Sequence, residues 1–424
     1  MNQFHLNIEV QLKSKSPVKY KDVIDSISVY LKEETTHRVL IERCKSHMTM
    51  NDNGNLESFQ WDVDQLPMNI SKHVDRVDIF PVCRVVESSV EIEFNIHVYK
   101  LSKEKSSDEV SQDQDESSPF QQWILPNQEF GTLWESLAFD DSLKSQLLDY
   151  ISTLLLFGRF QIDSNIITNN RILFLYGPPG TGKTSLAKAL AQKISVRFQN
   201  QFKDSFQLFE INSHSLFSKW FSESGKLVMK LFQRIREQLE DQNSFLVLLI
   251  DEVESLTSAR KSALQGNEPS DAIRVVNAFL TQLDQLKLYK NILIISTSNL
   301  PQAVDDAFID RADWKQYIGP PSIKARDYIF SSIINELQQK QFIQPSTTNI
   351  LMETDDQSNS KAITIQELIK LTDAHSGRFL RKLPFLAISK CISSGYTPPI
   401  PYNEFLKSLH ICILNNKIKE EFGK

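Results

Sequence analysis

Apolar and polar residues alternate along two stretches of the first hundred residues. In FHLNIEVQL (4–12) and VEIEFNIHVYKL (90–101), apolar residues recur at every second position, which is typical of strands with one buried face. Between them, YKDVIDSISVYLKEE (20–34) places its apolar residues at helical spacing. We therefore predict a small α+β domain over residues 1–101. Because no cluster of catalytic side chains is visible in it, a docking or adaptor domain is the simplest interpretation.

A second pattern begins near residue 119. The runs RILFLYG (171–177), SFLVLLID (244–251) and NILIISTSN (291–299) are rich in apolar and β-branched residues and are separated by helical stretches. This alternation is typical of an α/β fold, a parallel sheet covered by helices on both faces. From about residue 323 the pattern becomes helical. We predict an α/β domain over residues 119–322 and a smaller helical domain over residues 323–424.

Residues 102–118, SKEKSSDEVSQDQDESS, contain one aliphatic side chain, Val110. Such a segment buries too little apolar surface to offset the entropy lost on ordering, so we predict a flexible acidic linker.

Composition narrows the function classes. The net charge of −6 argues against a generally basic surface that coats nucleic acid, so we expect no direct nucleic-acid binding. The four cysteines are scattered without zinc-site spacing, which favours free thiols in a reducing compartment. No apolar run approaches the roughly 18 residues of a membrane span, and no secretory signal is evident. We expect an intracellular, soluble protein without a membrane partner.

The stretch GPPGTGKT (177–184) has the spacing G-x-x-x-x-G-K-[ST], after a strand and before a helix. Glycines let successive N–H groups face an anion, and the helix N-terminus adds its dipole. We expect Lys183 to reach the β- and γ-phosphates of ATP and Thr184 to bind Mg²⁺. The expected nucleotide-binding residues are Gly177, Pro178, Pro179, Gly180, Thr181, Gly182, Lys183, Thr184 and Ser185, together with Asp251.

Two further strand ends carry polar side chains. Six apolar residues lead into Asp251 and Glu252, which predicts a Mg²⁺ ligand and a group that polarises the attacking water. The next apolar strand ends at Asn299, which is placed to orient that water in ATPases of this type. An ordinary solvated strand end or turn is the alternative for each.

Three arginines follow at informative places. Arg311 comes soon after the Asn299 strand, where it could reach the nucleotide of a neighbouring subunit; a surface salt bridge to Asp310 or Asp313 is the alternative. Arg378 and Arg381 lie one helical turn apart in the helical domain, and one of them could contact the nucleotide of its own subunit.

Adjacent aromatic residues, Trp220 and Phe221, lie in the serine-rich segment SHSLFSKWFSES (213–224). An aromatic pair is usually buried core, but this polar setting favours an exposed loop that grips a peptide.

With these motifs in order, the chain resembles an AAA+ ATPase. From about residue 130 onward it is similar to the pachytene checkpoint protein 2 family. The similarity is carried by LWESLAFDDSLKSQLLDYISTLLLF, INSHSLFSKWFSESGKLV, LIDEVESLTSAR, EPSDAIRVVNAFLTQLD, DRADWKQYIGPPS and SGRFLRKLPFLA.

The resemblance implies a homo-hexameric ring that uses ATP and Mg²⁺ to remodel proteins. Its implied substrates are HORMA-domain proteins of the spindle checkpoint and meiotic chromosome axes, docked by the N-terminal domain with a HORMA-like adaptor. It also implies residence in the nucleus and cytoplasm, at chromosomes or kinetochores.

The resemblance also assigns roles to individual residues. Arg311 becomes the arginine finger, Arg378 the second sensor and Asn299 the first sensor. The aromatic pair Trp220 and Phe221 becomes the substrate-gripping pore loop. Many relatives carry two finger arginines three residues apart, whereas Phe308 occupies the earlier position here.

Three alternatives remain open. A clamp loader or helicase would be expected to show basic pore residues in place of Trp220 and Phe221. An ATP-binding scaffold would be expected to lose the acid that Glu252 supplies. A small-molecule kinase would not need a long helical domain carrying Arg378.

Overall fold

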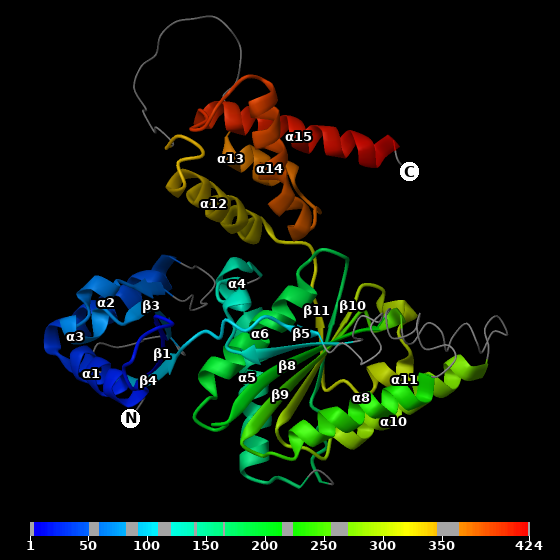
Figure 1. Cartoon of the computed structure of the whole chain (residues 1–424). Coiled ribbons are helices and arrows are strands. Elements are labelled where there is room, and N and C mark those ends of the chain that lie inside the picture. Colours follow the sequence, from blue (N-terminus) through cyan, green and yellow to red (C-terminus); the bar gives the residue numbers. More distant parts are fainter. Residues whose placement is uncertain are drawn as a thin grey trace, which may run out of the picture. The chain divides into compact units, whose positions relative to one another are not determined.

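The computed structural model describes residues 4–50, 59–81, 92–108, 120–139, 142–163, 166–213, 224–255, 270–345 and 364–422. The chain divides into two compact units (Figure 1). The first unit holds the N-terminal domain and most of the large sheet with its helices. The second holds the C-terminal helices together with residues 135–140 and 176–183.

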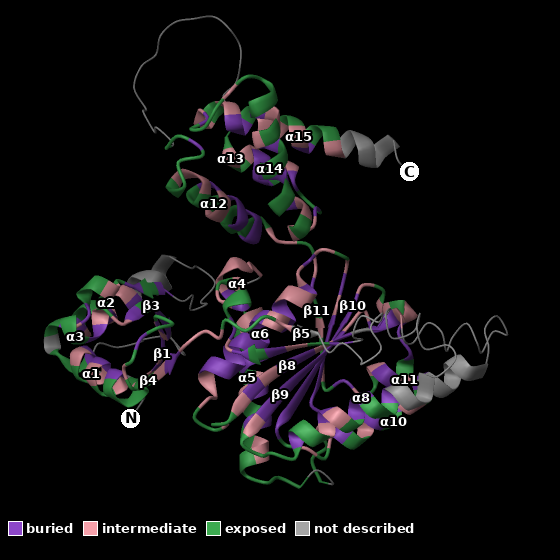
Figure 2. Ribbon diagram, in the orientation of Figure 1, coloured by how far each residue is buried: buried purple, intermediate pink, exposed green. Residues whose placement is uncertain are grey.

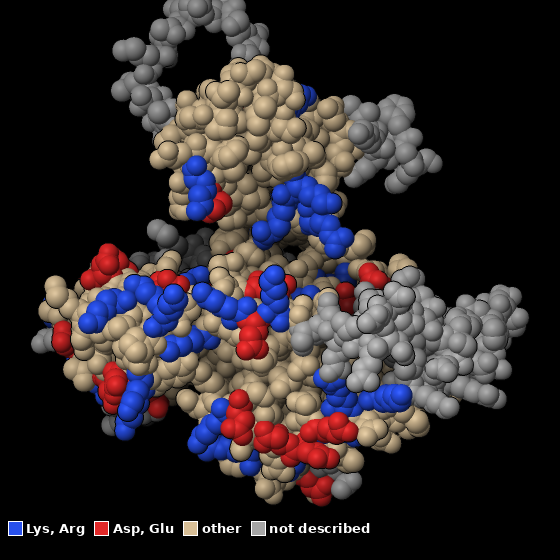
Figure 3. Space-filling view, viewed as in Figure 1, with Lys and Arg blue, Asp and Glu red and all other residues tan. Residues whose placement is uncertain are grey.

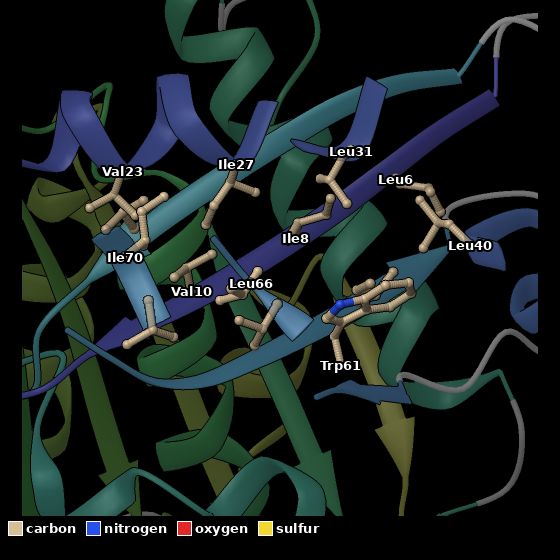
Figure 4. Close-up of a cluster of buried hydrophobic side chains, with 14 of the residues drawn as sticks. Leu6, Ile8, Val10, Val23, Ile27, Leu31, Leu40, Trp61, Leu66 and Ile70 are labelled. Carbon is tan, nitrogen blue, oxygen red and sulfur yellow. The ribbon is translucent and has the colours of Figure 1, made fainter. Parts of the chain in front are cut away.

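The N-terminal domain is a four-stranded sheet, of order β2-β3-β1-β4, with helices on one face. β1 runs antiparallel to β3 and parallel to β4. Its elements are β1 (Phe4–Leu12), α1 (Tyr20–Lys32), α2 (Glu34–Met50), β2 (Phe59–Trp61), α3 (Met68–Ser71), β3 (Val74–Pro81) and β4 (Ile92–Tyr99). The alternating residues of β1 and the helical stripe of α1 meet in one core, as their periods predict (Figure 4).

The other face of this sheet carries a row of polar side chains. Glu9 on β1 lies in register with Asp78 on β3 and with His97 on β4. The Glu9 carboxylate is 2% exposed and accepts hydrogen bonds from Lys193 Nζ at 2.6 Å and Arg197 Nε at 3.0 Å. These two cations belong to the α/β domain, so a buried ion cluster joins that domain to the N-terminal domain.

The α/β domain is built on a seven-stranded sheet of order β11-β7-β10-β9-β8-β6-β5. Its strands are β5 (Ser107–Asp108), β6 (Phe120–Leu125), β7 (Ile172–Tyr176), β8 (Ser205–Asn212), β9 (Ser244–Asp251), β10 (Ile292–Ser298) and β11 (Trp314–Tyr317). The central strands β8, β9 and β10 are parallel, and β9 and β10 are buried along almost their whole length, as their apolar runs predict (Figure 2).

Helices cover both faces of this sheet, as right-handed crossovers require. They include α4 (Leu133–Ser136), α5 (Leu143–Arg159), α6 (Lys183–Arg197), α8 (Ser224–Leu239), α10 (Ser270–Leu286) and α11 (Asp306–Ile309). Figure 1 shows α5 and α6 on one face and α8 and α10 on the other. α8 and α10 pack together through an edge-to-face contact between Phe232 and Phe279.

One edge of the sheet differs from the purely parallel arrangement that the sequence predicts. β6 is antiparallel to β8, and β5 is antiparallel to β6. Because β5 joins the sheet and Ser102 pairs with Asn127, the prediction of a flexible linker is wrong for residues 102–108. Backbone pairing at a sheet edge needs no apolar side chains, and composition could not show it. Residues 109–118 of the predicted linker lie outside the described residues.

The C-terminal helices form a separate lid domain. They are α12 (Ile323–Gln339), α13 (Ile365–Leu371), α14 (Gly377–Ser393) and α15 (Tyr402–Phe422). Their core includes Leu368, Leu380, Leu383, Phe405 and Leu409, each without exposed surface. The predicted fold class is confirmed: along the chain, an α+β domain is followed by an α/β domain and then by a helical domain. Among the residues that the structure describes, no helix is long and apolar enough to cross a membrane.

Candidate nucleotide site

The phosphate loop between β7 and α6 has a backbone that requires glycine. Gly177 has φ +148° and Gly180 has φ +77°. A Cβ on Gly177 would lie 2.1 Å from the carbonyl oxygen of Ile318, and one on Gly180 would lie 2.9 Å from Ser376 Oγ. Both glycines therefore allow the chain to pass closer to its neighbours than any side chain permits.

Lys183 and Thr184 begin the helix that follows the loop. Lys183 is 5% exposed, and its Nζ donates hydrogen bonds to the carbonyls of Gly177 at 2.9 Å and Pro178 at 2.8 Å. Its charge is thus held within the loop. The Thr184 hydroxyl donates to Asp251 Oδ1 at 2.7 Å. The glycine loop, the ammonium and this pair of hard oxygen ligands fit a nucleoside triphosphate with Mg²⁺.

The residues predicted to act in hydrolysis lie just beyond the carboxyl ends of β9 and β10. Glu252 has φ +56°, a conformation that costs a non-glycine residue about 1–3 kcal/mol and is found mostly at functional sites. Its Oε1 lies 3.3 Å from Asn299 Nδ2. The structure therefore brings the predicted acid and the predicted first sensor together.

Thr297 is a site residue that the sequence analysis missed. Its hydroxyl donates to Asp251 Oδ1 at 2.5 Å and accepts the Glu252 N–H at 3.2 Å. It therefore ties together the two acids that follow β9. A hydroxyl two positions before Asn299 was the available signal, but its partners depend on the register of β9 with β10.

The beginning of α14 lies on the phosphate loop. Arg378 donates its backbone N–H to the Gly180 carbonyl at 3.0 Å, and its side chain is exposed. Arg381 does not bond to the loop in the same way; its guanidinium donates to the carbonyl of Ser136. Of Arg378 and Arg381, only Arg378 is bonded to the loop among the described contacts.

A second group of missed residues lies beside the same loop. A Cβ on Gly182 would lie 3.5 Å from both Leu137 and Phe139. The hydroxyl of Tyr328, on α12, donates to the carbonyl of Glu135. The segment over residues 135–139 thus contacts both the loop and the lid, and nothing in its composition indicates this.

Arg311 is held by a residue of its own chain. Its Nε and Nη2 donate to the two carboxylate oxygens of Asp284, on α10, at 3.0 and 2.8 Å. The salt bridge considered from sequence is present, but Asp310 and Asp313 are the wrong partners. Phe308, at the position of the missing second arginine, is fully buried and packs edge-to-face with Phe174.

Asp313 instead binds the beginning of β7. Its carboxylate accepts the backbone N–H groups of Asn170 at 2.9 Å and Arg171 at 2.6 Å. It also accepts the Tyr150 hydroxyl at 3.2 Å. Burial, followed by the neighbouring Asp313 charge, raises the pKa of Tyr150, so this hydroxyl remains a hydrogen-bond donor at neutral pH.

The predicted pore-loop residues Trp220 and Phe221 lie outside the described residues, and their assignment stays a prediction.

Comparisons with known proteins match this architecture. Residues 173–320 match the family described as ATPase family associated with various cellular activities, and residues 322–417 match the TRIP13-like AAA+ ATPase lid C-terminal domain. A Danio rerio pachytene checkpoint protein 2 homolog is 44% identical, over 98% of this chain and 94% of the relative. The Homo sapiens homolog is 43% identical, over 81% and 82%.

Solved structures agree. C. elegans PCH-2 superposes with a TM-score of 0.71 and 30% identity, over 99% of this chain and 100% of that chain. A chain of the E. coli MS115-1 HORMA:CdnC:Trip13 complex gives a TM-score of 0.50 and 20% identity, over 69% of this chain and 93% of that chain. At that identity the likeness shows the fold alone. The chain therefore belongs to the pachytene checkpoint protein 2 family, and it is an AAA+ ATPase.

Proposed function

We propose that the chain forms a hexameric ring that hydrolyses ATP to remodel HORMA-domain proteins, converting them from a closed to an open state. The observation that carries this proposal is family similarity along 98% of the chain, which includes the N-terminal domain as well as the ATPase. A Trip13 protein of the same fold has been solved together with a HORMA protein, which supports this substrate class.

The residues of the site have distinct roles in this proposal. Lys183 neutralises phosphate charge, and Glu252 accepts a proton from the attacking water while Asn299 orients it. Mg²⁺, held by Thr184 and Asp251, would offset the negative charge of the phosphates.

Two arginines would connect hydrolysis to motion. Arg311 is proposed to leave Asp284 and reach the nucleotide of the neighbouring subunit, so that hydrolysis depends on assembly. Arg378, bonded to Gly180 by its backbone, is proposed to carry the nucleotide state to the lid. Trp220 would then pull on the substrate.

Surface charge is compatible with a polypeptide substrate. On the face in Figure 3, basic and acidic side chains are interspersed over the N-terminal and ATPase domains. Strong binding of a nucleic-acid backbone would instead favour a continuous basic surface.

The test is a substrate trap. Glu252→Gln should bind ATP, assemble and hydrolyse poorly, so a HORMA-domain protein should co-purify with it in ATP and be identified by mass spectrometry. Light scattering should give six times the 48.8 kDa chain mass. Two controls are Lys183→Ala, which should capture nothing, and Glu252→Gln combined with Trp220→Ala, which should lose the capture if the pore loop grips substrate.

An assembled, ATP-bound trap that captures no polypeptide would contradict the proposal and favour a scaffold. Capture of DNA-bound factors alone would favour a loader or helicase.

A further inference from the structure

Glu254 is a buried acid that the mechanism above does not use. Its side chain is 8% exposed, and its Oε1 accepts the backbone N–H of Asn299 at 2.9 Å. We propose that Glu254 is a positioning residue for ATP hydrolysis, which holds the backbone of Asn299 and thereby keeps the Asn299 amide beside Glu252.

The place of this bond explains why it matters. The register of β9 with β10 ends at the pair Ile250 and Ser296, before the hydrolytic residues are reached. Beyond that pair, Val253 N–H still bonds to the Thr297 carbonyl at 2.9 Å. Further along, the Glu254 carboxylate links the turn after β9 to the backbone of Asn299.

The position of the Asn299 amide beside Glu252 depends on the backbone of Asn299. Asn299 Nδ2 lies 3.3 Å from Glu252 Oε1, at the outer limit of a hydrogen bond. A displacement of about 1 Å at such a pair can lower a rate about a hundredfold. Because Glu254 fixes the main chain from which the Asn299 amide projects, loss of its bond would displace the amide without removing any group that touches ATP.

The second oxygen of Glu254 shows that the acid is not optimal for folding alone. Oε2 is buried and has no hydrogen-bond partner among the described residues. A buried carboxylate with an unsatisfied oxygen is unfavourable, and a glutamine could accept the same N–H with a smaller desolvation cost. What the carboxylate adds is a charge-assisted bond, which is about twice as strong as a neutral one.

The first experiment compares Glu254→Leu, which removes the acceptor, with Glu254→Gln, which keeps it without the charge. We expect Leu to lower kcat for ATP about tenfold with KM within about twofold, and Gln to retain a rate between those of Leu and the unchanged protein. Binding of a non-hydrolysable ATP analogue and the melting temperature report whether each variant is folded.

The matched control lies at the other end of the same strand. Asn291 is buried, and its Nδ2 donates to the carbonyls of Leu239, Asp241 and Ser244. Asn291→Ala should lower the melting temperature while leaving kcat within about twofold, since it loosens β10 far from Asn299.

The decisive experiment is a double-mutant cycle with Asn299→Ala. If Glu254 acts through Asn299, then Glu254→Leu should lower kcat less than about twofold once the Asn299 amide is absent. The proposal is overturned if the two effects multiply, if Glu254→Leu raises KM while kcat is unchanged, or if Glu254→Leu has the rate of the unchanged protein. Should the leucine variant fail to fold, the same cycle is run with Glu254→Gln, and full multiplication there overturns the proposal equally.

Discussion

Replacing Glu9 by glutamine tests whether the buried ion cluster attaches the N-terminal domain to the ATPase domain. The substitution keeps the shape of the side chain and removes its charge. It removes the negative charge that Lys193 and Arg197 both contact, and the side chains of these cations are only 6% and 16% exposed. Both cations would then lose the buried carboxylate that they share.

The magnitude follows from the geometry. At an effective dielectric constant of about 20, contacts of 2.6 and 3.0 Å correspond to gross attractions of about 6 kcal/mol each. Desolvation of the three charges offsets much of this, and removing one partner of a buried pair costs about 3–5 kcal/mol. We expect Glu9→Gln to lower the free energy of unfolding by that amount.

Low pH should lower the free energy of unfolding in the same way as Glu9→Gln, because protonation also removes the Glu9 charge. Burial alone would raise the pKa of Glu9, but the charges and hydrogen bonds of Lys193 and Arg197 outweigh it and lower that pKa. The stabilisation is therefore complete above the ordinary carboxyl pKa of 4.5 and is lost as pH falls through the lower value of the folded protein.

The assay is urea unfolding at pH 7, with hydrogen exchange to report on the N-terminal and ATPase domains separately. Glu93→Gln is the matched control, because that carboxylate pairs with His5 on the same sheet and is 56% exposed. Its removal should cost less than about 1 kcal/mol. A loss of the same small size for Glu9→Gln would refute the reasoning, because it would show that water screens the cluster.

Three further outcomes are expected. Lys183→Ala should abolish ATP binding measured by calorimetry, and retained micromolar affinity would reject the phosphate-loop assignment. Arg311→Ala should slow hydrolysis in the assembled protein while each subunit still binds ATP; an unchanged turnover rate would reject the finger role. Burial lowers the pKa of His97 to about 4, so as pH falls from 6.5 the unfolded chain binds a proton first and stability should decrease, by at most about 3 kcal/mol at pH 4. His97→Gln should flatten that part of the pH–stability curve, and an unaltered slope would show that another group is responsible.

The parts of the fold that follow from local pattern could be predicted from the sequence. β1 alternates because one face is buried, β9 and β10 are continuous because both faces are buried, and the phosphate loop is a local motif. Each of these depends on residues close together in the chain. The loop, its lysine and the strand-end acids could therefore be placed without knowledge of the tertiary structure.

The remaining features depend on residues far apart in the chain. Asp284 pairs with Arg311 although nearer acids were available, because Arg311 faces α10. Glu254 meets Asn299 only once β9 and β10 are in register. The composition of residues 102–118 did not reveal β5, because polar residues can form an edge strand through backbone hydrogen bonds alone. None of these contacts leaves a periodic signal in the sequence.

Asp313 holds the segment over residues 311–313 in place at a second point, in addition to the Arg311–Asp284 salt bridge. Arg311 is fixed to α10, and two residues later Asp313 grips the N–H groups at the beginning of β7, the strand that leads into the phosphate loop. Because of these hydrogen bonds, a shift of β7 would also move the segment that carries Arg311. A movement of β7 in one subunit would therefore change the position of Arg311, which we propose contacts the nucleotide of the neighbouring subunit. In the proposed ring, this linkage would make hydrolysis in one subunit depend on the nucleotide state of the next.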